Sequence, residues 1–153
     1  MKARRVVRLG CLAALAALSS ASAPPSALLA PPSVTVFKDP NCGCCKSWIE
    51  HLRKHAFKVT ARDTSDINGP KRTARVPEQL YSCHTAFVGG YVIEGHVPAE
   101  DIQRLLKEKP KIAGIAAAGM PIGSPGMEMG SRKDHYDVVA FNRDGTTHLF
   151  ARH

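Results

Sequence analysis

Asp39-Pro40-Asn41-Cys42-Gly43-Cys44-Cys45-Lys46 is the stretch around which the fold is organised. It lies between an alternating apolar run, residues 33–38, and a segment with helical spacing, residues 46–56. A strand that ends in a Pro/Asn/Gly turn and leads into a helix brings the three thiols to the positive end of the helix dipole, where thiolates are favoured. Thiolates attack disulfides and bind soft metals. We therefore expect the chemistry here, since three thiols in a polar turn are hard to bury as small hydrophobic side chains.

The first 21 residues have the pattern of a secretory signal peptide: a basic start, an apolar run over 9–18 and small residues over 19–23. The apolar run is too short to span a bilayer comfortably and is soon followed by Pro24-Pro25. Cleavage after Ala21 fits the small-x-small rule. The residues around Cys11 are in the wrong order for lipidation, because the apolar run follows this cysteine. We expect a periplasmic chain without Cys11 and without a membrane span in its mature form.

The composition suits one globular domain, with 44% hydrophobic and 22% charged residues in a chain of 153. Four of the 21 basic residues and none of the 13 acidic ones lie in the signal segment, which leaves 17 against 13, a net charge of +4. This balance is too mild to indicate nucleic-acid binding, and no basic patch is interleaved with aromatic residues. We interpret the charge as ordinary solvated surface.

The mature chain is predicted to alternate strands and helices. Residues 22–32 are rich in Pro, Ala and Ser and are predicted to be a flexible leader. The predicted elements are a strand at 33–38, a helix at 46–56, a strand at 57–63, a loop or short irregular helix at 64–75 with a turn at Asn68-Gly69-Pro70, a hairpin at 86–88 and 91–94 joined by Gly89-Gly90, and a helix at 99–108.

This order predicts an α/β (α+β) fold with a mixed four-stranded sheet and flanking helices, the layout of a thioredoxin or glutaredoxin. Two early strands joined by a helix should be parallel, and the hairpin should add two antiparallel strands. Residues 109–153 are predicted to be a C-terminal extension with a Gly/Pro/Met-rich loop at 119–130 and a final hairpin at 136–141 and 146–150. We expect a single domain over 33–153, with 33–108 as its core.

Cys83 and His84 are predicted to face the cysteine turn, because the loop that enters the third strand of such a fold lies against it. Thioredoxins usually have a cis-proline in that loop, whereas this chain has Cys83-His84-Thr85. A cis bond without proline costs about 2.5–4 kcal/mol, so we expect a trans peptide and a site of different shape. The missing ring also leaves room that a metal could use.

Several motifs in order carry a resemblance to a known family. They are Cys-x-Cys-Cys after the first strand, Ser82-Cys83-His84-Thr85, the hairpin from Val88 to Pro98, and Gly-Met-Pro-x-Gly-Ser-Pro-Gly-Met-Glu at 119–128. Together they resemble the thioredoxin-like CopG family of periplasmic copper-resistance proteins, over nearly the whole mature chain. The resemblance implies copper bound by the thiolates of Cys42, Cys44, Cys45 and Cys83, with His84 beside them, and a role in copper redox handling. Other periplasmic copper-handling proteins are then the expected partners.

The chemistry of the residues agrees with this implication. Thiolates select Cu(I), zinc or iron–sulfur clusters over hard ions. Four crowded thiolates repel one another unless cations neutralise them, and the adjacent Cys44 and Cys45 cannot easily chelate one tetrahedral ion. We therefore expect bridging sulfurs and more than one Cu(I).

Two further groups of residues leave alternatives open. Met120, Met127 and Met129 lie in the Gly-rich loop, either as thioether ligands of Cu(I) or, for Met120 and Met127, as side chains that pack the loop onto the domain. His51 and His55 are four residues apart on the first helix, the spacing of a two-histidine metal site, but their basic flanks favour a solvated face. We expect no special role for His96, His135, His148 and His153.

Three functions from different classes follow. The first is Cu(I) binding, with or without a copper oxidoreductase activity. The second is a thiol–disulfide oxidoreductase in which Cys42 and Cys45 are catalytic. The third is a structural zinc site in a binding module, although such sites usually offer two separated ligand pairs. The first is preferred because it uses all four thiols, whereas a third thiol beside a redox pair invites wrong disulfides. An oxidised Cys42–Cys45 bond would be the resting state of a metal-free site.

Overall fold

The computed structural model describes residues 30–153. The predicted signal peptide, Cys11 and most of the predicted leader lie outside this range. The elements are β1 (Ser33–Lys38), α1 (Gly43–Lys54), β2 (Lys58–Asp63), α2 (Asn68–Ala74), the 3-10 helix η1 (Glu78–Leu80), β3 (His84–Val88), β4 (Tyr91–Gly95), α3 (Ala99–Glu108), β5 (Gly114–Ala117), β6 (Asp137–Phe141) and β7 (Thr147–Arg152).

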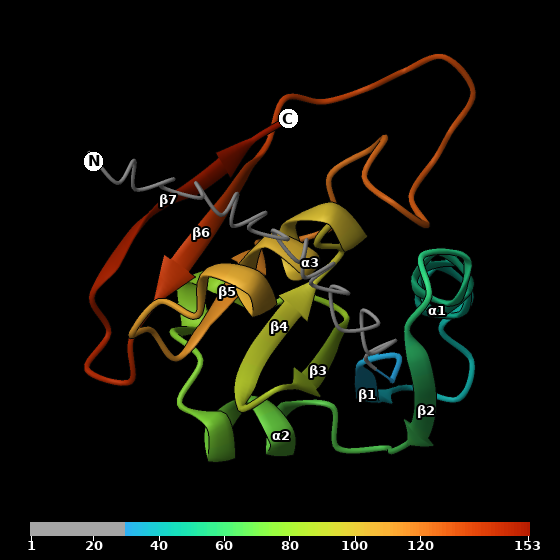
Figure 1. The fold of residues 1–153 in the computed structure, drawn as a ribbon. Helices are drawn as coiled ribbons and strands as arrows, with labels where there is room; N and C mark the ends of the chain where they lie inside the picture. Colours follow the sequence, from blue (N-terminus) through green and yellow to red (C-terminus); the bar gives the residue numbers. More distant parts are fainter. Residues whose placement is uncertain (1–29) are drawn as a thin grey trace, which may run out of the picture.

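All seven strands form one mixed sheet in the order β2-β1-β3-β4-β5-β6-β7 (Figure 1). β1 and β2 are parallel, as the helix between them requires, and β3 is antiparallel to both β1 and β4. The β3–β4 hairpin turns at Gly89-Gly90, where both residues have positive φ. The mixed α/β class predicted from the sequence is confirmed, and the first four strands are paired as predicted.

Two hydrophobic layers cover the sheet. On one face the apolar stripes of α1 and α3, including Trp48, Leu52 and Ile102, pack on alternate strand residues such as Val36 and Ile93. On the other face, α2 and the residues up to Leu80 cover a smaller cluster. The side chains of a strand alternate between faces, so Ile93 belongs to the first layer and Val92 to the second. The cysteine turn lies at the end of β1, where α1 begins.

The sheet is wider than the four strands expected. β5 pairs in parallel with β4 and antiparallel with β6, and β6 pairs with β7, so these three strands continue the sheet. The long segment between β5 and β6, residues 118–136, leaves the sheet and reaches over towards α1 (Figure 1). The extension therefore adds strands to the sheet, and its loop lies next to α1.

Several predicted element bounds differ from the structure by one to three residues. α1 begins at Gly43, three residues earlier than predicted, because Cys42 caps it. α2 is a regular helix over Asn68–Ala74, and Asn68-Gly69-Pro70 forms its first turn. Proline fits there because the first N–H groups of a helix have no partner within it. The described residues contain no cis peptide bond, which agrees with the trans bond predicted at Cys83-His84.

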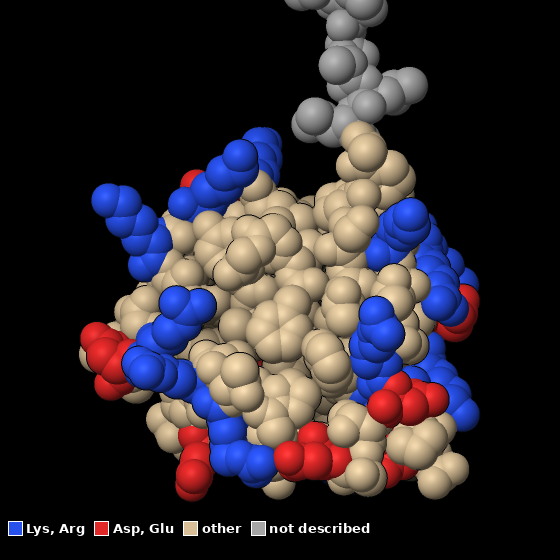
Figure 2. Space-filling view, turned by 90° about the horizontal axis from the view of Figure 1, so that it is seen from below, with Lys and Arg blue, Asp and Glu red and all other residues tan. Residues whose placement is uncertain are grey.

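The charged side chains are dispersed on the face seen in Figure 2. Lys and Arg lie along its rim among Asp and Glu, and uncharged side chains occupy its middle. This pattern fits the interpretation of the charge as solvated surface. Among residues 30–153, none of the helices is both long and apolar enough to span a membrane.

Candidate metal centre

The cysteine turn is shaped by local hydrogen bonds. The Asp39 carboxylate accepts the backbone N–H of Asn41 at 2.7 Å, and the Asp39 carbonyl accepts that of Cys42 at 3.1 Å. Cys42 is the N-cap of α1, where its Sγ accepts the backbone N–H of Cys45 at 3.3 Å. The first turn of α1 therefore carries Cys44 and Cys45 at the positive end of the helix, as the sequence predicted.

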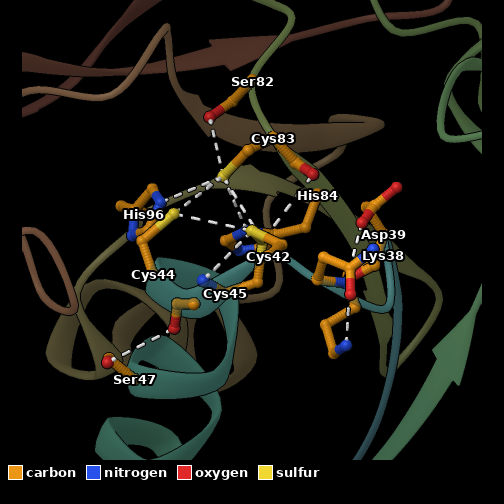
Figure 3. The surroundings of a disulfide bond; sticks show 12 residues. Lys38, Asp39, Cys42, Cys44, Cys45, Ser47, Ser82, Cys83, His84 and His96 are labelled. Carbon is orange, nitrogen blue, oxygen red and sulfur yellow. Dashed lines mark hydrogen bonds between the residues drawn. A yellow bond between two sulfur atoms is a disulfide. The ribbon is translucent and has the colours of Figure 1, made fainter.

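Four sulfurs gather at this turn (Figure 3). Cys42 and Cys45 form a disulfide, while Cys44 and Cys83 are free. Cys44 Sγ lies 3.5 Å from Cys42 Sγ and 3.9 Å from Cys83 Sγ, and Cys45 Sγ lies 3.6 Å from Cys83 Sγ. The four Sγ atoms all lie within 4.8 Å of one another. The structure thus brings together the four cysteines that the sequence singled out, from β1–α1 and from the start of β3.

Cys83 is half-buried and lies beside Cys45, the fully buried cysteine of the group. Burial, followed by the neighbouring Cys44, raises the pKa of the Cys83 thiol to about 12. A thiol with so high a pKa is protonated at neutral pH, because hydrogen bonds from the Ser82 hydroxyl and the backbone compensate only part of the charge of a buried thiolate. A bound cation would supply that compensation, since metal ligation deprotonates a thiol.

Two histidines flank Cys83 (Figure 3). Its Sγ lies 3.3 Å from His84 Nδ1 and 3.1 Å from His96 Nε2, and these three residues form a second group that could hold a metal ion. His96 Nδ1 donates to the Pro125 carbonyl at 2.8 Å, which leaves the Nε2 lone pair facing the sulfur. An outer hydrogen bond of this kind orients histidine ligands in metal sites.

His84 is fully buried, and its Nε2 has no hydrogen-bond partner among the described residues. Burial, with His96 and Lys71 as smaller contributors, holds the pKa of His84 well below its usual value. Burial also lowers the pKa of His96. Both imidazoles are therefore neutral at pH 7, the form that binds metals.

The Gly/Pro/Met-rich loop is attached to this centre at two points. Ser82 Oγ donates to the Gly119 carbonyl, and Gly119 N–H donates to the Tyr81 carbonyl at 3.2 Å. At the second point, a Cβ on Gly126 would come within 2.8 Å of the Cys44 carbonyl oxygen and 2.7 Å of Trp48 N, so only glycine allows this approach. Met120 and Met127 directly follow these two glycines.

The three methionines differ in exposure. Met120 and Met129 are 53% and 61% exposed, whereas Met127 is partly buried. The packing role considered for Met120 is therefore wrong in this structure, because more than half of its surface faces solvent. The role of their thioethers as ligands of Cu(I) stays a prediction.

Comparisons with known proteins agree with this geometry. A family model described as "Protein of unknown function, DUF411" matches residues 80–127, which include Cys83, His84, His96 and much of the loop. Two solved structures, "Copper resistance protein copG" in form 2 and form 1, are 46% identical to this chain. Each covers 80% of this chain and 98% of its own, with TM-scores of 0.77 and 0.76. No curated protein matches the chain. The chain belongs to the CopG family of copper resistance proteins.

Membership of the CopG family and the cysteine cluster together indicate copper handling. The donor set fits this cargo, because four sulfurs and two neutral imidazoles are ligands that Cu(I) prefers to hard oxygen donors. An oxygen-binding ion such as Mg²⁺ or Ca²⁺ would find no carboxylate in either of the two groups that contain Cys83.

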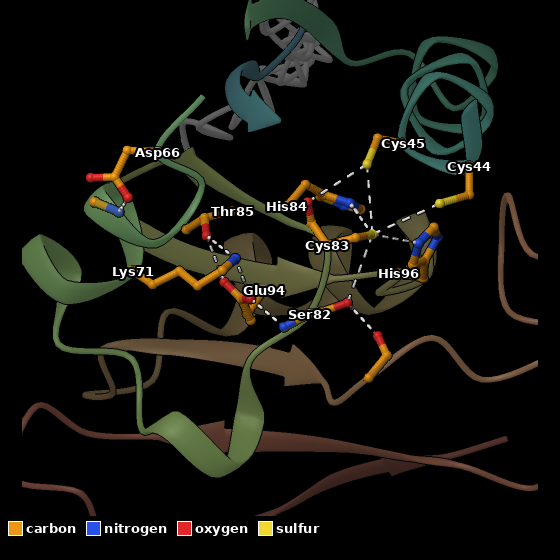
Figure 4. Close-up of polar contacts among 12 residues, drawn as sticks. Cys44, Cys45, Asp66, Lys71, Ser82, Cys83, His84, Thr85, Glu94 and His96 are labelled. Atoms are coloured by element: carbon orange, nitrogen blue, oxygen red, sulfur yellow. Dashed lines mark hydrogen bonds and ion pairs between the residues drawn. The ribbon is translucent and has the colours of Figure 1, made fainter. Parts of the chain in front are cut away.

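A buried ion pair supports the Cys83 segment of this CopG family member (Figure 4). Lys71 Nζ lies 2.7 Å from Glu94 Oε1, and both side chains are at most 1% exposed. Glu94 Oε1 also accepts the backbone N–H of Ser82 at 2.7 Å, and both charged groups bond the Thr85 hydroxyl. The pair therefore fixes the residues on both sides of Cys83 and His84.

Sequence reasoning missed His96, although the hairpin contained the signal. The register pairs Thr85 with Glu94 across the Gly89-Gly90 turn. Two residues further along, the same antiparallel register sets Cys83 opposite His96. Extending the predicted hairpin backwards would have found this contact.

His51 and His55 lie away from the cysteines, towards the end of α1. They approach Glu100 of α3, and the ligand atoms of the three residues all lie within 4.8 Å of one another. The basic flanks suggested a solvated face, whereas both side chains are partly buried. The remaining histidines differ among themselves: His135 and His148 are exposed, and His153 Nε2 lies 2.7 Å from Asp101 Oδ2.

Proposed function

We propose that this protein binds Cu(I) on the thiolates of Cys42, Cys44, Cys45 and Cys83 after reduction of the disulfide, with more than one copper per chain. The observation that carries the proposal is the contact of Cys83, the residue before β3, with Cys44 and Cys45 of α1 at Sγ–Sγ distances of 3.9 and 3.6 Å. Sulfurs so close repel as thiolates, and shared cations remove that repulsion. Cu(I) is therefore the cargo, held for copper resistance in an exported, periplasmic protein.

His84 and His96 extend the proposed ligand set. Both imidazoles point a nitrogen at Cys83 Sγ, and both are neutral for the reasons given above. Cys83 is the one residue shared by the sulfur group and the mixed sulfur–nitrogen group, which supports a bridging role for its thiolate. Met120, Met127 and Met129 are proposed as outer thioether donors in the loop that covers the centre.

A second candidate function is favoured by the disulfide itself. Oxidation of the Cys42 and Cys45 thiolates to the disulfide releases two electrons, enough to reduce two Cu(II) to two Cu(I). The same pair could instead exchange with a protein disulfide, as a thiol–disulfide oxidoreductase. Zinc stays the alternative metal, since thiolate and imidazole also bind it.

The Cys83→Ser variant separates a copper cluster from a simple redox pair. In anaerobic titrations of reduced protein against a Cu(I) chelator, wild type should bind more than one copper and Cys83→Ser should bind fewer, because loss of a bridging sulfur releases metal. Insulin reduction should change little in Cys83→Ser if Cys42 and Cys45 act alone.

The control is Ser47→Ala, which alters the same helix turn without removing a sulfur. It should keep the full copper complement. A Cys83→Ser protein with the wild-type number of coppers would refute the cluster, and one tightly held zinc with no copper in the wild type would refute the cargo.

A further inference from the structure

We propose a second metal site, built from His51, His55 and Glu100, that takes Cu(II). It joins the last turns of α1 to the first turn of α3, and it contains no sulfur. The proposal goes beyond Cu(I) binding on the cysteines and does not depend on it.

His55 is oriented as a ligand. Its Nδ1 donates to the His51 carbonyl at 2.8 Å, which leaves the lone pair of the neutral ring on Nε2. This Nε2 lies 3.1 Å from Glu100 Oε1. Two acceptor atoms in contact need a cation between them, either a proton or a metal ion. The outer bond to a backbone carbonyl is the kind that fixes the tautomer of metal-binding histidines.

His51 provides the second imidazole. Its ring centroid lies 4.3 Å from that of His55, and its Nε2 accepts the backbone N–H of Ala99 at 3.1 Å. Ala99 is the first residue of α3, so its N–H has no partner within the helix. When a metal binds His51 Nε2, the Ala99 N–H loses this acceptor. Because His51 is partly exposed, a water molecule can accept the Ala99 N–H instead.

Carboxylates near the two histidines favour a bound cation. Glu100 Oε1 lies 3.1 Å from His55 Nε2, and Glu128 lines one shared surface depression with His51. Both carboxylates are close enough to act on the charge of His51. Lys54 lines the same depression and opposes the binding of a cation.

The ligand chemistry distinguishes this site from the cysteine centre. Imidazole and carboxylate suit divalent ions of intermediate hardness, and Cu(II) binds such donors more tightly than Zn(II). His51 is seven residues from Cys44 on the same helix face, roughly 10 Å along the axis at 1.5 Å per residue. The two centres therefore share no ligand and can be loaded separately.

The test uses the Cys44→Ser/Cys83→Ser chain with its Cys42–Cys45 disulfide intact, which removes both free thiols. Cu(II) is added with glycine as the competing ligand, and binding is followed by equilibrium dialysis and by electron paramagnetic resonance. We expect one Cu(II) with hyperfine coupling to two imidazole nitrogens. His55→Ala should weaken binding about tenfold or more, and Glu100→Gln should weaken it less. Zn(II) should compete poorly.

His148→Ala is the matched control, because this exposed histidine of β7 belongs to none of the groups that could hold a metal among the described residues. It should leave Cu(II) affinity unchanged. Unaltered binding and spectrum in His55→Ala would overturn the proposal, because the ion would then be bound elsewhere in the chain. Equal losses in His55→Ala and His148→Ala would also overturn it, as nonspecific binding. Cu(I) stoichiometry of the reduced His55→Ala chain, measured separately with all cysteines present, should equal that of the wild type.

Discussion

Glu94 is a buried carboxylate whose charge is compensated by Lys71. Burial raises its pKa, while Lys71, Thr85 and the backbone of Ser82 act in the opposite direction. Both side chains are excluded from water, so substitution of one residue leaves the other as a buried ionisable group without a partner. Glu94 also accepts the backbone N–H of Ser82, so the ion pair helps to hold the neighbouring Cys83 in place.

Substitution of Lys71 should therefore be costly. Lys71→Met is expected to lower the free energy of unfolding by about 3–5 kcal/mol, because it strands Glu94. The double variant Lys71→Met/Glu94→Leu should lose much less than the sum of the two single variants. Urea unfolding of the metal-free protein measures both.

Arg72 offers the matched control for this substitution. It pairs with Asp66 at 2.9 Å on the surface, with both side chains about 60% exposed. Arg72→Met should cost about 1 kcal/mol or less, as surface ion pairs do. A cost for Lys71→Met no larger than that of the control would show that the buried pair contributes nothing.

At the scale of the elements, the loop over residues 118–130 connects the extension to the cysteine centre. Gly126 and Gly130 both have positive φ, 84° and 62°, but their surroundings differ. A Cβ at Gly126 would collide with the backbone of α1, whereas nothing lies within 4 Å of one at Gly130. An alanine would be strained by the positive φ at either position, but only at Gly126 would its Cβ also clash with α1.

Gly126→Ala should lift the loop from α1, and Gly130→Ala should not. We expect faster peroxide oxidation of the partly buried Met127, followed by mass spectrometry, and weaker Cu(I) binding in the Gly126→Ala chain. The two effects share a cause, because the loop also carries Pro125, whose carbonyl orients His96. Identical behaviour of the two variants would mean that close packing of Gly126 on α1 does not matter for the centre.

The sequence predicted the elements that have strong local signals. Trp48, Ile49 and Leu52 mark the buried face of α1, and the Gly89-Gly90 turn marks the hairpin. β5 was missed because Gly114-Ile115-Ala116-Ala117 has little intrinsic strand preference, and its conformation depends on pairing with β4 and β6. His96 was missed because the predicted hairpin was not extended past Glu94 to the contact with Cys83. The contact of Glu100 with His55 was missed because it joins two helices, which no local pattern encodes.

At the scale of the whole molecule, the extension is continuous with the rest of the sheet. Ile115, Val138 and Ala140 belong to the same hydrophobic layer as Trp48 and Ile102. α3 is also linked to the C-terminal strand, since Arg104 donates to the Phe150 carbonyl at 2.9 Å and His153 Nε2 contacts Asp101 Oδ2. On the basis of these contacts we propose that residues 33–153 form one domain.

We propose that the chain is exported, and export would decide whether Cys11 is among the thiols of the mature protein. The disulfide between Cys42 and Cys45 suits an oxidising compartment, and the first 21 residues resemble a signal peptide. We expect the mature chain isolated from the periplasm to begin near Ser22, without Cys11. Alkylation followed by mass spectrometry should then label two cysteines before reduction and four after it. A Cys11→Ser precursor, the control, should yield a mature chain of identical mass and copper content. A chain that retains Met1, or one that carries lipid on Cys11, would contradict export by this route and would add a fifth sulfur to the thiols available for copper.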